Sequence, residues 1–100
     1  MFKVTVLYNQ PTDPAGFEDY YFDRHLSIAA KIPNVTRVET ARAAATPNGS
    51  PLPYFRMAEI WFNDLETLQA SMGSPEGQAT VADLANFATA GADVFIAAVD

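Results

Sequence analysis

The sequence predicts an α+β fold in which helices cover one face of a single antiparallel sheet. Two observations lead to this prediction. Short β-branched and aromatic segments alternate with longer segments whose apolar residues recur at helical spacing, in the order strand–helix–strand–strand–helix–strand. The chain also has only 100 residues, which is the size of one domain. We therefore treat residues 1–100 as a single domain.

The first half of the chain predicts a strand and a long helix. Residues 2–9 carry apolar side chains at both odd- and even-numbered positions, which is typical of a strand covered on both faces. Asp13 and Pro14 are suited to the N-cap and first position of a helix that continues to Lys31, and Pro33 ends it. At about 100° per residue, one face of this helix carries Phe17, Tyr21, Arg24, His25, Ile28 and Ile32.

The second half predicts two more strands before the next helix. Residues 35–46 and residues 54–62 alternate as strands do. In the later strand, even-numbered residues share one face and odd-numbered residues, including Trp61, share the other. The loop between the strands carries a turn signal at Asn48-Gly49.

The remaining segments complete the pattern. Asn63 and Glu66 are the expected capping pair for a helix over LETLQASM, and Ser74-Pro75 begins another helix. The expected apolar stripe of that helix is Val81, Leu84, Ala85 and Ala88. ADVFIAAV, residues 92–99, is the last strand.

This element order is that of the ferredoxin-like βαββαβ fold, with a four-stranded antiparallel sheet and both helices on one face. Helices cover only one face, yet the strands are apolar on both, and 49% of the residues are hydrophobic. The second face therefore needs another cover, most simply the same sheet of a second copy. We expect a homodimer in which the two sheets pack face to face.

Composition excludes several classes of function. The net charge is −6 at pH 7, and the six Lys and Arg residues are scattered, which disfavours nucleic acids and anionic membrane surfaces. With no cysteine and one histidine, a zinc site is not expected, and the default location is the cytoplasm. Haem with His25 as a lone axial ligand has no second feature to support it. We expect neither metal nor cofactor.

The candidate catalytic residues are His25 and Tyr21. His25, the only histidine, lies toward one edge of the apolar face of its helix. A neutral imidazole there can act as general base or acid toward an enolisable or phenolic substrate. Tyr21 lies one turn earlier, where it can orient the imidazole or bind a ligand oxygen. The alternatives are a structural histidine bonded to a carbonyl or carboxylate, and a tyrosine that only packs.

Six further side chains are candidates for contacting a small organic ligand. Two tyrosines and the tryptophan combine an apolar body with a polar tip, although dimer or core packing is the favoured alternative for each of them. The phenylalanine and the methionine can only shape a pocket. The arginine could hold a ligand carboxylate or pair with Glu59. The six are Tyr8, Arg24, Tyr54, Trp61, Met72 and Phe87.

Three segments in order resemble the EthD family, named for ethyl tert-butyl ether degradation, of the dimeric α/β barrel superfamily. The segments are YYFDRHLSIAAKIPNVTRVE, PYFRMAEIWF and SPEGQATVADLANFA. The resemblance implies a ferredoxin-like fold, two sheets packed across a dimer, and a pocket between sheet and helices in each subunit. The family's Arg-His-Leu motif corresponds to Arg24, His25 and Leu26, of which only His25 carries over as a functional candidate.

Two functions follow from these expectations. The first is cofactor-free proton transfer at His25, as in an isomerase, cyclase or decarboxylase of a catabolic or ether-degradation pathway. The second is a non-catalytic accessory or ligand-binding protein of a monooxygenase system, with that monooxygenase pathway as partner. A purely structural His25 remains the third interpretation.

Overall fold

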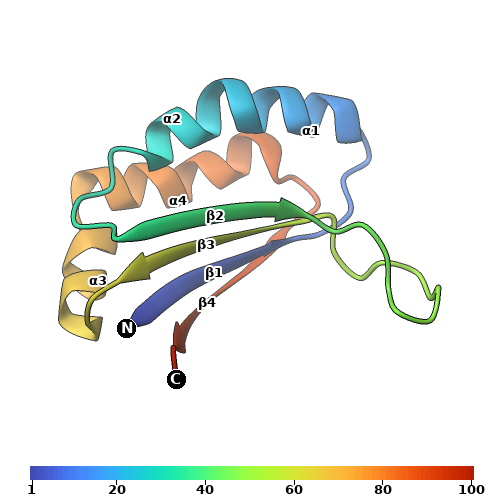
Figure 1. Cartoon of the computed structure of the whole chain (residues 1–100). Helices are drawn as coiled ribbons and strands as arrows, with labels where there is room; N and C mark the ends of the chain where they lie inside the picture. Colours follow the sequence, from blue (N-terminus) through green and yellow to red (C-terminus); the bar gives the residue numbers. More distant parts are fainter.

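The computed structural model describes all of residues 1–100 and contains one four-stranded antiparallel sheet (Figure 1). Its strands lie in the order β2-β3-β1-β4, and every neighbouring pair is antiparallel. This topology confirms the predicted α+β, ferredoxin-like fold. The strands are β1 (Phe2–Tyr8), β2 (Arg37–Arg42), β3 (Arg56–Phe62) and β4 (Ala92–Ala98).

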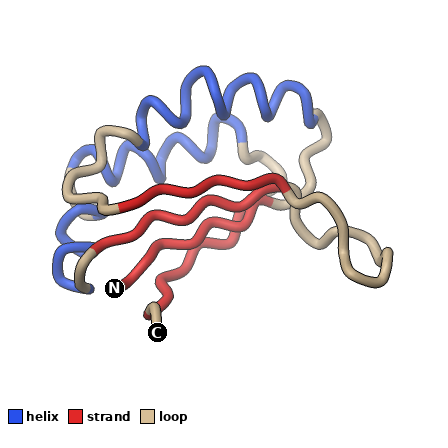
Figure 2. The backbone as a smooth tube through the Cα atoms, in the orientation of Figure 1, coloured by secondary structure: helices blue, strands red, loops and turns tan.

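The helices lie together on one face of this sheet, as predicted (Figure 2). The first helical segment runs without a break through α1 (Pro14–Tyr20), a π-helical turn (Tyr21–His25) and α2 (Leu26–Ala29). Beside it lies α4 (Pro75–Phe87), and the short α3 (Leu65–Met72) precedes α4 near one end of the sheet. None of the helices is long and apolar enough to span a membrane.

Local signals locate most of the boundaries. The Asp13 carboxylate accepts a hydrogen bond from the Gly16 N–H at 3.1 Å, and the Ser74 hydroxyl accepts one from the Gly77 N–H at 3.2 Å. Both caps were predicted. The predicted Asn63–Glu66 pair is wrong, because Asp64, one residue later, accepts the Thr67 N–H at 2.7 Å.

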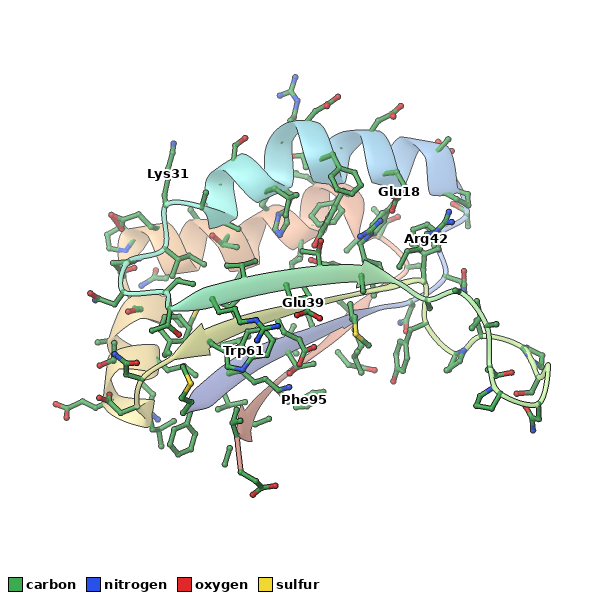
Figure 3. The ribbon with its side chains drawn as sticks, viewed as in Figure 1. Glu18, Lys31, Glu39, Arg42, Trp61 and Phe95 are labelled. Atoms are coloured by element: carbon green, nitrogen blue, oxygen red, sulfur yellow. The ribbon has the colours of Figure 1, made fainter.

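The two faces of the sheet differ sharply. Toward the helices, alternate side chains of β1 and β3 are buried, in the predicted register. They form the apolar core with residues of the helices: Val4, Val6, Tyr8, Phe17, Tyr21, Ile32, Ala58, Ile60, Phe62, Leu68 and Phe87. The opposite face has no cover, and Figure 3 shows Glu39, Trp61 and Phe95 on it. Phe95 is 48% exposed there.

The predicted apolar stripe of α4 is correct only in part, because Leu84 and Ala88 pack against the core but the other two residues do not. The buried residues of this helix are Gly77, Thr80, Asp83 and Phe87, whereas Val81 and Ala85 are exposed. Two contacts set the rotation of α4 about its own axis. Asp83 reaches across to the first helix, and Gly77 approaches the backbone that ends α3 so closely that a Cβ would lie 2.4 Å from the Ser71 carbonyl oxygen.

Because of the close approach at Gly77, the direction in which Gly77→Ala changes the free energy of unfolding tests the fold. By helix propensity alone, Gly77→Ala would stabilise α4 by about 1 kcal/mol. We expect instead a loss of about 1–3 kcal/mol in the free energy of unfolding, because the new Cβ meets backbone atoms that cannot rotate away. Urea denaturation followed by circular dichroism measures the difference. Any stabilisation would contradict this packing.

Candidate functional site

A single π turn positions the only histidine. In this turn, the Leu26 N–H donates to the Tyr21 carbonyl, so it holds one residue more than an α turn. The extra residue rotates the positions that follow it. Tyr21 and His25 are both buried, at 0% and 4% exposed, whereas Arg24 is exposed. The prediction that Arg24 shares the apolar face, and can hold a ligand carboxylate there, is wrong for this reason.

The His25 imidazole is held by Asp83 of α4. Nδ1 of His25 lies 2.9 Å from Oδ2 of Asp83, and both side chains are buried. The other carboxylate oxygen, Oδ1, accepts hydrogen bonds from the Tyr20 hydroxyl at 2.7 Å and from the Asn86 amide at 2.9 Å. Three donors therefore converge on one carboxylate, and they come from both helices of the layer.

These donors determine the ionisation of Asp83. Burial acts to raise its pKa, but the hydrogen bonds from Asn86, Tyr20 and His25 outweigh burial and hold the pKa below the usual range. Asp83 is therefore an ionised acceptor near neutral pH. Because a carboxylate can only accept, Nδ1 of His25 must carry the proton, and in the neutral ring Nε2 keeps a free lone pair.

Aromatic rings fix the imidazole on its other sides. The centroid of the Phe87 ring lies 4.5 Å from that of His25, and the Tyr21 ring stacks on His25 at 5.7 Å with an interplanar angle of 26°. Behind Tyr21, Tyr8 packs edge-on against its ring at 5.7 Å and Phe17 stacks on it at 5.8 Å. The imidazole is thus held by packing as well as by its hydrogen bond.

A cavity lies between the helices and the sheet beside His25. It offers ≈ 40 Å³ to the centres of water molecules, where about 10–15 Å³ suffices for one. No Lys, Arg, Asp or Glu belongs to its lining, and 13 of its 16 lining residues are hydrophobic. They are Val4, Val6, Tyr8, Tyr21, His25, Leu26, Ala29, Val38, Thr40, Ala58, Ile60, Met72, Thr80, Val81, Leu84 and Val94.

The structure brings four of the eight predicted site residues to this cavity. Its lining includes Tyr8, Tyr21, His25 and Met72. Phe87 does not line it, but its ring packs directly against the imidazole. These five share the helix-facing side of the sheet because strand and helix periodicity place them there.

The other predicted ligand contacts are wrong for this cavity. Trp61 lies on the uncovered face of the sheet, where Lys3 and Arg37 approach its ring at 5.1 and 4.9 Å. Tyr54 precedes β3, and its hydroxyl donates to Asp93 at 3.0 Å. The expected Arg24–Glu59 pair is also absent, because Glu59 pairs with Lys3 on the uncovered face.

The sequence alone did not reveal Asp83 and its two further donors. The only available signal was an acidic residue, at position 83, within the otherwise apolar half of a helix. The burial of Arg56 was not predicted from the sequence either. Its guanidinium makes two hydrogen bonds to Glu18, at 2.9 and 2.7 Å, and lies over the rings of Tyr21 and Phe22 at 4.9 and 5.0 Å. Arg56 is therefore already paired and does not line the cavity.

No three His, Cys, Asp or Glu side chains of the chain lie close enough together to hold a metal ion. The chemistry available at the site is that of an imidazole, the carboxylate behind it and the neighbouring phenols.

Comparison with known proteins shows the family of this chain. The EthD domain matches residues 9–91. The chain belongs to the EthD family. An uncharacterised 11.0 kDa protein of the thcB-thcC intergenic region in Rhodococcus erythropolis is 35% identical over 91 residues, which are 91% of this chain and 87% of that protein.

Solved structures extend the comparison to three dimensions. An EthD family protein from Bacillus halodurans C-125 is 31% identical and superposes with a TM-score of 0.93, over 100% of this chain and 99% of that one. A dimeric ferredoxin-like protein of unknown function from Jannaschia sp. CCS1 is 18% identical, with a TM-score of 0.73 over 98% of each chain. At that identity, the second likeness shows the fold alone.

The carboxylate behind His25 gives stability a defined pH dependence. The pKa of Asp83 is lowered in the folded protein, so Asp83 stabilises the fold above its unfolded pKa of about 3.9. This stabilisation is lost as the pH falls through the lower, folded pKa. We therefore expect the free energy of unfolding to drop below about pH 4, and Asp83→Asn to flatten that slope.

Urea titrations between pH 7 and pH 2.5 measure the slope. At pH 7, Asp83→Asn should also cost about 1–3 kcal/mol, because buried donors lose a charged acceptor. Asp19→Asn, at an exposed position of α1, is the matched control and should keep the wild-type slope. Equal slopes for wild type and Asp83→Asn would contradict the assigned role of this carboxylate.

Proposed function

We propose that this EthD family protein binds a small organic molecule in the cavity beside His25 and moves a proton on it without a cofactor. One observation carries the proposal. An ionised, buried carboxylate occupies Nδ1 of an imidazole that lines an apolar cavity. This arrangement leaves Nε2 as the ring's available base and keeps the ring in one tautomer.

The proton balance of such a reaction is simple. Nε2 removes a proton from a carbon next to a carbonyl, or from a phenolic hydroxyl, and becomes an imidazolium. Asp83 stabilises the imidazolium charge and does not itself take the proton, because its pKa is lowered. The proton then returns to the same or another atom of the substrate. Isomerisation and cyclisation use this step, and neither requires an oxidant.

A panel of cyclic ketones and lactones in D₂O tests the proposal. We expect the protein to accelerate deuterium incorporation next to the carbonyl, as measured by NMR. His25→Ala should lose about 10²-fold or more of that rate, and Asp83→Asn should lose part of it because the tautomer is no longer fixed. Circular dichroism checks that both variants are folded.

The exposed position Asp19→Asn again serves as the control and should exchange at the wild-type rate. If His25→Ala exchanged every accelerated substrate at the wild-type rate, the catalytic role of His25 would be refuted.

The second candidate is a non-catalytic ligand-binding or accessory protein of a monooxygenase system. The apolar lining favours it, because such a cavity takes up small apolar molecules whether or not His25 reacts. In that case ligands bind to wild type and His25→Ala alike, and neither accelerates exchange. Either role would be played in the cytoplasm, the location that the cysteine-free sequence favours.

The proposed assembly is a homodimer joined through the uncovered sheet face. Met57 and Phe95 are 40% and 48% exposed on this face, and such exposure is typical of a surface that a partner covers. Four of its charges are already paired within the chain, Lys3 with Glu59 and Arg37 with Glu39. A second copy can therefore cover the face without leaving these four charges unpaired. A structural neighbour with this fold is dimeric, which supports a dimer.

One substitution on this face should convert the dimer into monomers. Phe95→Glu introduces an unpaired charge where the second sheet would lie, whereas Ala85→Glu adds the same charge at an exposed position of α4. Analytical ultracentrifugation should show dimers for wild type and Ala85→Glu, and monomers for Phe95→Glu. Trp61, the only tryptophan, reports the same change by a red shift of its fluorescence. A monomeric wild type at micromolar concentration would refute the dimer.

A further inference from the structure

We infer that the cavity selects an uncharged molecule with one carbonyl or hydroxyl oxygen on an apolar skeleton, and that Tyr21 donates a hydrogen bond to that oxygen. The inference rests on the proposed function only in placing a ligand in the cavity. It adds the chemical class of that ligand and the residue that recognises it.

The Tyr21 hydroxyl makes no hydrogen bond of good geometry within the protein, although the Thr40 hydroxyl in the same cavity lining lies close enough to act on its pKa. Only three buried side-chain polar atoms of the chain make no hydrogen bond, those of Thr5, Tyr21 and Ser71, and Tyr21 alone belongs to the cavity lining. Tyr21 is completely buried, so water outside the protein does not compensate for the missing bond. A buried hydroxyl in this state is unfavourable. A ligand oxygen in the cavity would satisfy it.

Tyr21 retains a proton that it can donate under ordinary conditions. Burial raises its pKa to about 12, although the Arg56 guanidinium over its ring acts in the opposite direction. The phenol therefore keeps its proton near neutral pH. Its natural partner is an acceptor such as a carbonyl, ether or hydroxyl oxygen.

The lining sets the charge of the ligand. The cavity has no cationic side chain, and Arg56, the buried cation nearest to it, is bound to Glu18. A carboxylate or phosphate would lose its hydration without gaining a counter-charge. The ionised Asp83 behind the imidazole adds repulsion for any anion. Neutral ligands are therefore selected over acids of the same shape.

Two hollows next to the cavity set the shape of the ligand. On the side of α2 and β2, a hollow of ≈ 320 Å³ shares Leu26, Ala29, Val38, Thr40 and Ile60 with the cavity. On the side of β4, a hollow of ≈ 540 Å³ shares Val4, Met72, Val81 and Val94 with it. Large apolar side chains are unusually exposed at both openings, with Val38 at 56%, Val81 at 49% and Val94 at 46%. A skeleton of two rings or more would cover them.

The distance between the Tyr21 and His25 rings connects ligand binding to the proposed proton transfer. Tyr21 and His25 stack with their centroids 5.7 Å apart, so a ligand oxygen bound by the phenol keeps its neighbouring carbon close to the imidazole. A ketone held in this way presents its acidic C–H bond to the base.

Three probes with one skeleton test the inference: 1-tetralone, tetralin and tetralin-1-carboxylate. The Cε1–H signal of His25, the only histidine, reports binding by NMR without labelling. In wild type, we expect 1-tetralone to bind at least tenfold more tightly than tetralin and tenfold more tightly than the carboxylate. Equal binding of the ketone and the hydrocarbon, tightest binding of the carboxylate, or no binding of any probe would overturn the inference.

Tyr21→Phe isolates the hydroxyl. It should reduce the affinity for 1-tetralone to that for tetralin and leave tetralin binding unchanged, while Tyr54→Phe, outside the cavity, should alter neither. The melting temperature of Tyr21→Phe should not fall, because the removed hydroxyl made no hydrogen bond of good geometry. A tenfold preference for the ketone that survived in Tyr21→Phe would overturn the inference.

Deuterium exchange into 1-tetralone separates the two proposals. Tyr21-dependent binding without His25-dependent exchange would refute the proposed catalysis and support the inference. His25-dependent exchange that is indifferent to Tyr21→Phe would support the catalysis and refute the inference.

Discussion

The buried hydrogen bond between His25 and Asp83 is the constraint on which the helical layer depends. An ionised carboxylate removed from water must be surrounded by donors, and here they come from Tyr20, His25 and Asn86. Satisfying Asp83 therefore fixes how α4 packs on the first helix and turns polar residues of α4 inward. The structural and functional interpretations of His25 then require the same geometry, because the bond that joins the helices also sets the tautomer of the ring.

That arrangement depends on the π turn in the first helix. Uniform α-helical spacing would place Arg24 and His25 at opposite edges of the apolar face, so a cation would border the cavity. The extra residue in the turn moves His25 toward Asp83 and Arg24 into solvent. π turns are rare and occur frequently at functional sites, which agrees with the position of this one between the two candidate catalytic residues.

What the sequence could predict here was set by local geometry. The two-residue period of strands placed Tyr8 on the helix side of the sheet, and Asp13 and Ser74 signalled their caps through hydrogen bonds to nearby residues. Arg24 was misplaced because the π turn depends on the fit between helices. Asp83 was missed because it meets His25 across 58 positions of sequence. Trp61 was assigned to a ligand although its parity places it on the other face.

The distribution of positive charge explains why the cavity is neutral. Of the six Lys and Arg residues, Lys3, Arg37 and Arg56 are paired with Glu59, Glu39 and Glu18, and Arg24, Lys31 and Arg42 are exposed. Close to the cavity, the Asp83 carboxylate is then the one charge without a Lys or Arg partner, and it favours a positive imidazolium and disfavours an anionic guest. When a neutral ligand gives a proton to His25, the ligand becomes an anion and the imidazole becomes an imidazolium at the same time. The site is thus suited to stabilise the ion pair formed during the reaction more than a charged ligand in the ground state, which is the condition that catalysis requires.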